Sequence, residues 1–398
     1  MTYKNILTYL LDKYLDKNWN FGKNGISFNP NLTIELIEKY PNKDWDFGSR
    51  GISSNPALTI EMLEKYHDKD WDFNEYGISS NLALTIEMLE KYQDKDWNFG
   101  LYGISSNPVL TIEMLEKFPN KDWDFNAISC NSNFKIEMFE KFPDKDWNFM
   151  YISLNYVLTI EIIEKYSNIY FDFSEFGISS NPSLTLEILE RFPYEDWSFG
   201  KYGISSNSAL TIEMLEKYPD KNWNFSKNGI STNPALTIKM LEKFPDKDWD
   251  FGKHGISSNP ALTLEMLEKF PNKNWYFGEF GISSNPALTL EILEKYINKK
   301  WKWKGHTHCI SSNKAFTPEM FEKYPKKGWQ FRFISKNPNI TIKFIKENIN
   351  KFNFKSLSSN HFTYIKKNFK NIHQKTKLFY YLYFTKLIYD LRRYSTTF

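Results

Sequence analysis

The stretch W-D-F-G-K-H-G-I-S-S-N-P-A-L-T-L-E-M-L-E-K-F, from Trp249 to Phe270, covers most of one copy of a unit that fills nearly the whole chain. An aromatic residue, almost always Trp, marks the start of each copy, and most copies are 26 residues long. Regular self-similarity at this period is typical of arrays in which small units stack on their neighbours. The marks are Trp19, Trp45, Trp71, Trp97, Trp123, Trp147, Phe171, Trp197, Trp223, Trp249, Trp275, Trp301, Trp329 and Phe352.

Residues that commonly end or begin helices divide the unit into two short helical pieces. Asn259 followed by Pro260 is typical of a helix end with Asn in the left-handed conformation. Thr263 is a typical N-cap for a following helix at 264–270, because its side-chain oxygen can accept a backbone N–H. The Gly- and Ser-rich piece at 252–259 has poor helix propensity, and both a single α-turn and a 3₁₀ turn remain open for it.

The second helix is apolar around more than half of its circumference, which favours packing between neighbours on both sides. Glu265 and Lys269 are four residues apart in the favourable order, so we expect an ion pair within the helix. Helices this short are marginal in isolation, and stacking of successive repeats must therefore supply the stability.

The pattern N-P-x-x-T-x-E-x-L-E, followed by an acidic loop and by I-S-x-N-P one repeat later, resembles the leucine-rich repeat variant. That family has repeats of about 24 residues, the length of the units 123–146 and 147–170 here, whereas the longer units carry two extra residues before the Ile. The chain is also similar to the Asn-, Lys- and Trp-rich tandem-repeat proteins of giant DNA viruses. The resemblance implies an all-α fold, a right-handed α-solenoid of about 14 two-helix repeats of 24–28 residues.

Three regions follow from this pattern. Residues 1–18 are expected to form an N-terminal capping helix, 19–364 the solenoid, and 365–398 basic C-terminal capping helices, since arrays need caps for their last apolar faces. Binding to a membrane surface through Lys and aromatic side chains is the alternative for the last region.

Composition and motifs exclude several classes of protein. Two distant cysteines, Cys130 and Cys309, do not make a disulfide framework, and the chain has no apolar stretch long enough for a membrane span or a signal peptide. We therefore expect a cytoplasmic protein, located in the host cytoplasm or the virion if it is viral. No nucleotide-binding, zinc-protease or hydrolase motif occurs, which predicts a non-enzyme without cofactors. For His306, His308 and Cys309 a plain loop insertion is favoured over a zinc site, because a fourth ligand is not identified.

Charge is divided unevenly along the chain. Residues 299–398 hold 22 Lys and Arg against four acids, whereas the first 298 residues hold 29 against 44. A basic block of this kind is found in proteins that bind nucleic acid, anionic membranes or acidic proteins. Its aromatics, such as Trp303 and Phe333, either stack bases or belong to the same core as in the other repeats. Candidate anion-binding residues are Lys366, Lys367, Lys370, Lys375, Lys377, Arg392 and Arg393.

The repeats differ most at the fourth and fifth residues after the Trp. Variation within one array marks positions where packing is indifferent, and it arises either by drift or by selection for a partner. Tyr, Phe and Arg are typical anchors of protein interfaces. The sequence therefore predicts a monomeric protein-binding scaffold, with nucleic-acid or anionic-surface binding through 299–398 as the alternative. Candidate partner-binding residues are Arg50, Tyr76, Tyr102, Phe176, Tyr202, His254 and Phe280.

Overall fold

The computed structural model describes residues 6–305 and 307–362. By its contacts the chain divides into two compact units, 1–147 with 361–398 (unit 1) and 148–360 (unit 2), and each is described by itself. Within the described ranges every regular element is a helix and there is no strand, which confirms the predicted all-α class.

The α-helices of unit 1 are α1 (Ile6–Lys13), α2 (Ile34–Lys39), α3 (Ile60–Lys65), α4 (Ile86–Lys91), α5 (Ile112–Lys117), α6 (Phe125–Ser129) and α7 (Ile136–Lys141). Its 3₁₀ turns are η1 (Ile26–Phe28), η2 (Ile52–Ser54), η3 (Ile78–Ser80) and η4 (Ile104–Ser106).

The α-helices of unit 2 are α8 (Phe149–Ser153), α9 (Ile160–Lys165), α10 (Leu186–Arg191), α11 (Ile212–Lys217), α12 (Ile238–Lys243), α13 (Leu264–Lys269), α14 (Leu290–Lys295), α15 (Pro318–Lys323), α16 (Phe331–Ile334), α17 (Ile342–Glu347) and α18 (Phe354–Leu357). Its 3₁₀ turns are η5 (Ile178–Ser180), η6 (Ile204–Ser206), η7 (Ile230–Thr232), η8 (Ile256–Ser258), η9 (Ile282–Ser284), η10 (Ile310–Ser312) and η11 (Ile349–Lys351).

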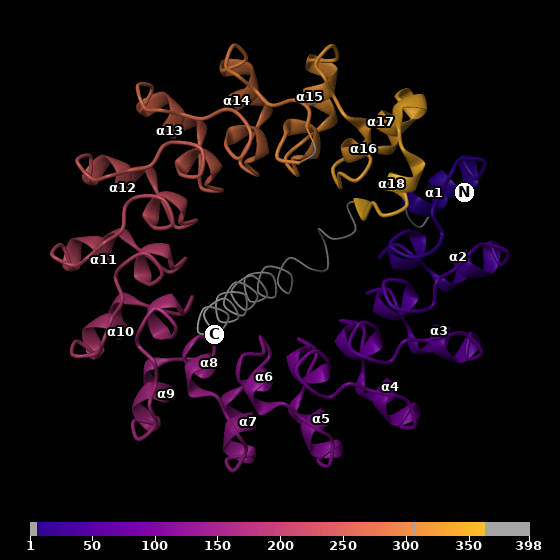
Figure 1. Ribbon diagram of the computed structural model, residues 1–398, viewed down its shortest axis with the longest axis horizontal. Helices are drawn as coiled ribbons and strands as arrows, with labels where there is room; N and C mark the ends of the chain where they lie inside the picture. Colours follow the sequence, from indigo (N-terminus) through magenta and orange to yellow (C-terminus); the bar gives the residue numbers. More distant parts are fainter. Residues whose placement is uncertain (1–5, 306, 363–398) are drawn as a thin grey trace, which may run out of the picture. The chain divides into compact units, whose positions relative to one another are not determined.

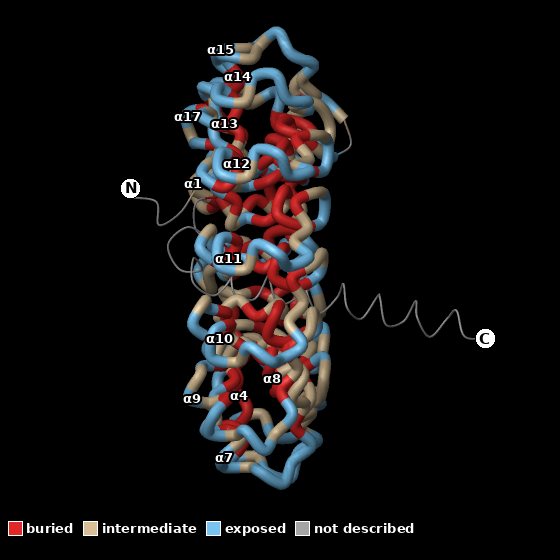
Figure 2. Tube along the Cα trace, turned by 90° about the vertical axis from the view of Figure 1, so that its left-hand side faces the viewer, coloured by how far each residue is buried: buried red, intermediate tan, exposed pale blue. Residues whose placement is uncertain are grey.

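Each unit is a row of repeats in which one repeat contacts the next. The six-residue helices follow one edge of the row and the shorter pieces follow the other (Figure 1). Consecutive 3₁₀ turns touch each other from η1 to η4 in unit 1 and from η5 to η10 in unit 2. Buried residues of successive repeats form a band between exposed segments (Figure 2). The Ile that opens each of the turns η1 to η10 is at most 1% exposed, which places these turns in the core, whereas Ile349 of η11 is half-buried.

The predicted Thr cap is confirmed. In α13, the hydroxyl oxygen of Thr263 accepts a hydrogen bond from the N–H of Met266 at 3.2 Å, and the same contact recurs in most repeats. The helix ends at Lys269, with Phe270 as its C-cap.

The length of the repeat decides the form of the short piece. In the 26-residue repeats it is a three-residue 3₁₀ turn, as in η8. In the 24-residue repeats it is an α-helix of five residues, α6 or α8, and Asp124 or Asn148 caps it. The 24-residue repeats have two fewer residues before the Ile, and there the α-helix begins directly after the capping residue. The choice between an α-turn and a 3₁₀ turn, which the sequence left open, therefore depends on repeat length.

A buried Asn ends each short piece, and the predicted left-handed Asn cap is wrong. Asn259 has φ −72° and ψ 128°, which is extended backbone. Its side-chain amide instead donates to the carbonyl oxygens of Ser231 and Asn233 in the preceding repeat, at 3.0 and 2.9 Å. Its Oδ1 accepts the N–H of Ala261 at 2.8 Å. Extended backbone points the amide at the neighbouring repeat, so this residue joins two repeats as well as ending a turn.

A buried Ser makes a second link between repeats. The hydroxyl of Ser231 donates to the carbonyl oxygen of Phe225 and accepts the N–H of Asp250 in the next repeat at 2.9 Å. This side chain is fully buried, so an unpaired hydroxyl there would be costly. The first Ser of I-S-S therefore has a structural role.

The Trp that marks the repeat is half-buried in most copies. The indole N–H of Trp97 donates to the carbonyl oxygen of Tyr92 at 2.7 Å, which satisfies a group at the end of α4. Its ring meets Phe73 of the preceding repeat edge to face, with centroids 5.0 Å apart. The Trp therefore caps the helix of the preceding repeat and packs against an aromatic ring of the same repeat.

Ion pairs connect neighbouring helices, which corrects the expected pair within one helix. Lys269 pairs with Glu242 of the preceding repeat, and not with Glu265. The same inter-repeat pair joins Lys217 to Glu190 at 2.7 Å. Each pair is exposed, so solvent screens it and it contributes little to stability. The sequence suggested a pair within the helix because Glu265 lies four residues before Lys269. In the structure Lys269 contacts Glu242, which lies on the helix one repeat earlier.

Replacing Asn107 by Ala tests the Asn contact. The change leaves the carbonyl oxygens of Ser79 and Asn81 without this donor and the N–H of Val109 without its acceptor, all inside unit 1. We expect the free energy of unfolding to fall by about 3 kcal/mol or more, since each unpaired buried group costs about 1–3 kcal/mol. Guanidinium titration followed by circular dichroism measures the change. The exposed Asn120 replaced by Ala is the control, and an equal loss in the two variants would contradict the assigned role.

Candidate functional site

The variable row consists of the two residues that precede the Gly-Ile pair in each 26-residue repeat. A tight turn carries them. In one copy, Oδ1 of Asp46 accepts the N–H of Gly48 at 2.8 Å, and the N–H of Ile52 returns to the carbonyl oxygen of Asp46, also at 2.8 Å. The base of the turn is therefore closed by hydrogen bonds, and the two residues at its tip are fixed through their backbone alone.

The Gly after the variable pair is required by close backbone approach. A Cβ on Gly103 would lie 1.9 Å from the carbonyl oxygen of Asn98, where no side chain fits. The conformation there is not left-handed, with φ −115°. Cys309 stands at this position in the 28-residue repeat, where two additional residues widen the turn and φ is −126°.

In unit 1 the row exposes two neighbouring tyrosines. Tyr76 is 71% exposed and Tyr102 is 54% exposed, although most aromatic rings of the chain are buried or half-buried. Arg50, one repeat earlier, is exposed as well. Because these side chains are largely exposed, packing in the core does not explain why large residues occupy these positions.

In unit 2 the row carries both isolated and stacked rings. Phe176 is 38% and Tyr202 is 61% exposed, and the Lys201 ammonium lies 4.6 Å from the centroid of the Tyr202 ring. Three successive repeats then form a ladder of rings. The centroid of Phe280 lies 5.4 Å from that of His254 and 4.1 Å from that of His308.

A lysine lies beside this ladder of rings. Lys253 lies 4.9 Å from the centroid of the Phe280 ring. Desolvation, followed by the charges of Lys227 and Lys253, lowers the pKa of His254 below its ordinary value. Its imidazole is therefore neutral near pH 7, which favours stacking on Phe280.

Five residues at the second position of the row have left-handed backbone. They are Asn24, Arg50, Asn228, Phe280 and His308, with φ between 55° and 63°. This conformation suits Asn but costs other residues about 1–2 kcal/mol. Where such strain is retained outside a packed core, a role for the side chain is a reasonable hypothesis.

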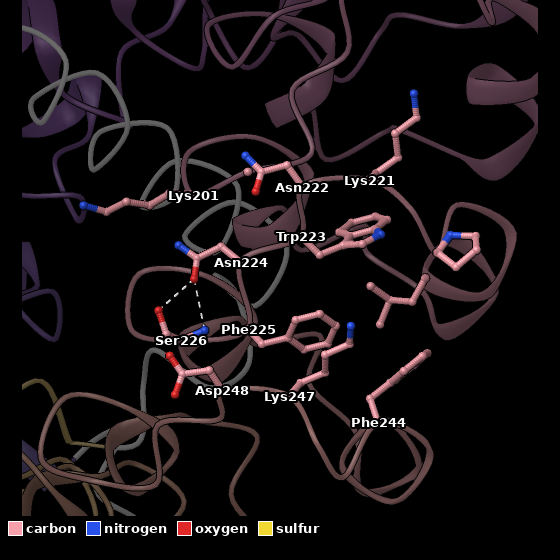
Figure 3. Close-up of a pocket in the computed structure, with 13 residues that line it drawn as sticks. Lys201, Lys221, Asn222, Trp223, Asn224, Phe225, Ser226, Phe244, Lys247 and Asp248 are labelled. Atoms are coloured by element: carbon pink, nitrogen blue, oxygen red, sulfur yellow. Dashed lines mark hydrogen bonds between the residues drawn. The ribbon is translucent and has the colours of Figure 1, made fainter.

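Shallow grooves lie between neighbouring repeats, and two of them are in unit 2. The Trp223 groove, about 560 Å³, is drawn in Figure 3 and includes Lys201, Trp223, Phe225, Lys247 and Asp248. The Trp303 groove, about 900 Å³, is lined by Trp301, Lys302, Trp303, Lys304, Gly305, Gly328, Gln330, Phe331, Arg332 and Phe333. The first contains an acidic side chain, whereas the second contains none.

The insertion that holds His308 and Cys309 forms a turn in the described residues. Cys309 is buried, and its N–H donates to the hydroxyl of Ser312 at 3.2 Å. His308 stacks on Phe280, as described above. In the part of the chain that the structure describes, which omits His306, no group of three His, Cys, Asp or Glu could hold a metal ion.

The structure separates the predicted site residues into two sets. The partner-binding candidates all lie on the variable row, three in unit 1 and four in unit 2. The anion-binding candidates Lys366, Lys367, Lys370, Lys375, Lys377, Arg392 and Arg393 lie outside the described residues. Sequence analysis did not single out Lys304 and Arg332. The available clue was their position three residues after the repeat-marking Trp301 and Trp329, Lys304 in a loop and Arg332 in α16.

Replacing Arg50 by Asn tests the strain at the row. Asn tolerates left-handed backbone, so we expect the free energy of unfolding to rise by up to about 1 kcal/mol. Urea titration measures the difference. Tyr76 replaced by Asn is the control, because its φ is not positive, and no gain is expected there. A clear loss of stability on replacing Arg50 would mean that its side chain contributes to packing.

Comparison with known proteins did not identify a family or a function for this site. The chain matched no protein-family model, no curated protein and no solved structure. No helix within residues 6–305 and 307–362 is long and apolar enough to cross a membrane.

Proposed function

We propose that the chain is a non-enzymatic, monomeric scaffold that binds a protein partner along its variable row. In this proposal the array is a right-handed α-solenoid of about 14 short repeats. The observation that carries the proposal is the exposure of large aromatic side chains at the positions where the repeats differ most. Tyr76 and Tyr102 are more than half exposed, in a protein that buries or half-buries most of its rings.

The physical argument concerns preorganisation. Hydrogen bonds close the base of each turn, so the side chains at its tip lose little backbone freedom on binding. Tyr and Arg provide large contact areas with polar ends, and both are enriched among the residues that dominate binding energy. A row of such side chains on a stacked array suits an extended partner that contacts several repeats.

Changing Tyr76, Tyr102 and Tyr202 together to Ser tests this proposal. We expect capture of the partner to be lost in pull-downs with the full chain, while the melting temperature stays within about 2 °C, because surface substitutions rarely change stability by more than 0.5 kcal/mol. Mass spectrometry after chemical cross-linking identifies what the unaltered chain captures.

The matched control replaces Tyr170 and Tyr194 by Ser. These residues are 88% and 98% exposed but lie off the row. The control should keep the partner. Equal capture by the triple variant would contradict binding along the row, and early melting of that variant would assign the tyrosines to packing.

A further inference from the structure

The two grooves of unit 2 are both lined by residues near the Trp positions of neighbouring repeats but differ in charge. In the Trp223 groove, Asn222 and Asp248 precede the Trp residues of two neighbouring repeats, and Asp248 adds one carboxylate to a lining that holds three lysines. In the Trp303 groove the equivalent loop position before Trp329 is Gly328, and three cations line the site without a carboxylate. The array therefore contains a basic groove and, a few repeats away, a natural control for it.

Two of the three cations lack an ionic partner. Lys302 lies 3.6 Å from a carboxylate oxygen of Glu279, so its charge is partly balanced. Within the described residues, Lys304 and Arg332 form no ion pair, and both side chains are exposed. The lysines that end most six-residue helices are paired with the preceding repeat, as in Lys323 with Glu294 at 2.9 Å. Lys304 and Arg332 therefore differ from the helix-ending lysines. Within the described residues the lysines of the Trp223 groove also form no ion pair, but Lys221 and Lys247 lie 5.3 and 5.4 Å from the ring centroids of Phe199 and Phe225.

Aromatic rings lie beside these cations. Trp303 meets Trp329 edge to face, with centroids 5.1 Å apart, and is half-buried. Phe333 is half-buried and has no ring neighbour among residues 6–305 and 307–362. The side chain of Gln330 accepts the N–H of Gly305 at 2.8 Å, which ties the two loops of the groove together. The groove thus presents fixed ring surfaces next to unpaired positive charge.

We propose that the Trp303 groove binds single-stranded nucleic acid. Lys304 and Arg332 contact the phosphates, and bases stack against the accessible surfaces of Trp303 and Phe333. A carboxylate-rich peptide satisfies the cations but leaves the ring surfaces unused, whereas an oligonucleotide supplies both phosphates and planar rings. This inference concerns a different ligand and surface from the protein-binding row.

The test uses the full chain and fluorescence anisotropy with labelled 12-nucleotide poly-dT and poly-U. The site variant carries Lys304→Glu and Arg332→Glu. The control carries Lys201→Glu and Lys247→Glu in the Trp223 groove, which changes the net charge equally and leaves the basic residues of 363–398 in place. We expect the site variant to bind at least tenfold more weakly at 150 mM salt and the control less than threefold. Melting temperatures establish that both are folded, and Lys304→Gln with Arg332→Gln replaces a site variant that does not fold.

Two further measurements separate this proposal from general charge attraction. Loss of two phosphate contacts should reduce the slope of log K against log salt by about 1.4, at about 0.7 per contact with a single strand. Phe333→Ser should weaken oligonucleotide binding severalfold and leave binding of inorganic polyphosphate unchanged, because polyphosphate has no rings. Equal losses in site and control variants would overturn the proposal. So would binding to polyglutamate or phosphatidylserine vesicles without binding to either oligonucleotide.

Discussion

The side-chain amide of one buried Asn in each repeat is the contact on which the stack depends. It accepts a backbone N–H of its own repeat and donates to two carbonyl oxygens of the repeat before it. The contact survives changes in repeat length. Asn131 in a 24-residue repeat and Asn313 in the 28-residue repeat make the same pair of bonds, with donor–acceptor distances of 2.8–3.1 Å. Buried amides must be paired, so this geometry fixes how one repeat sits on the next whatever the intervening loop contains.

That constraint explains where the chain is free to vary. The Ile, Ser and Asn of I-S-x-N are buried, and the Ser and the Asn are hydrogen-bonded to neighbouring repeats, so substitution of either disturbs two repeats at once. The turn before them is held by its own backbone and side-chain bonds, and residues at its tip meet few packing demands. Insertion of two residues in the Trp301 repeat and their omission in the Trp123 repeat both occur at this turn. Loops on a fixed scaffold are where binding residues are usually found, and both proposals place ligands on this side of the array.

Periodicity and capping chemistry predicted the repeat, its helical class and the Thr that starts each longer helix. They did not predict the contacts between repeats, because a single sequence does not say which groups one repeat turns toward another. Asn259 was expected to be left-handed since Asn-Pro commonly ends helices that way, whereas its extended backbone serves the neighbouring repeat. Lys269 was assigned to its own helix since Glu265 lies four residues away. The exposed tyrosines were predictable from variation between repeats. The charge of the Trp303 groove was not, because it depends on which loop residues of two repeats line one groove.

The most direct test of this account is removal of one complete repeat, residues 223–248. The deletion places Asn259 opposite Ser205 and Asn207, where Asn233 lies now, and Lys269 opposite Glu216. Because each repeat contacts its neighbours through the same groups, the account predicts a folded, cooperatively melting protein of modestly lower stability. Removal of only 223–235 breaks the register of these contacts and should cause a far larger loss. Calorimetry of both deletions measures the difference, and an unfolded 26-residue deletion would contradict the central role of the Asn contact.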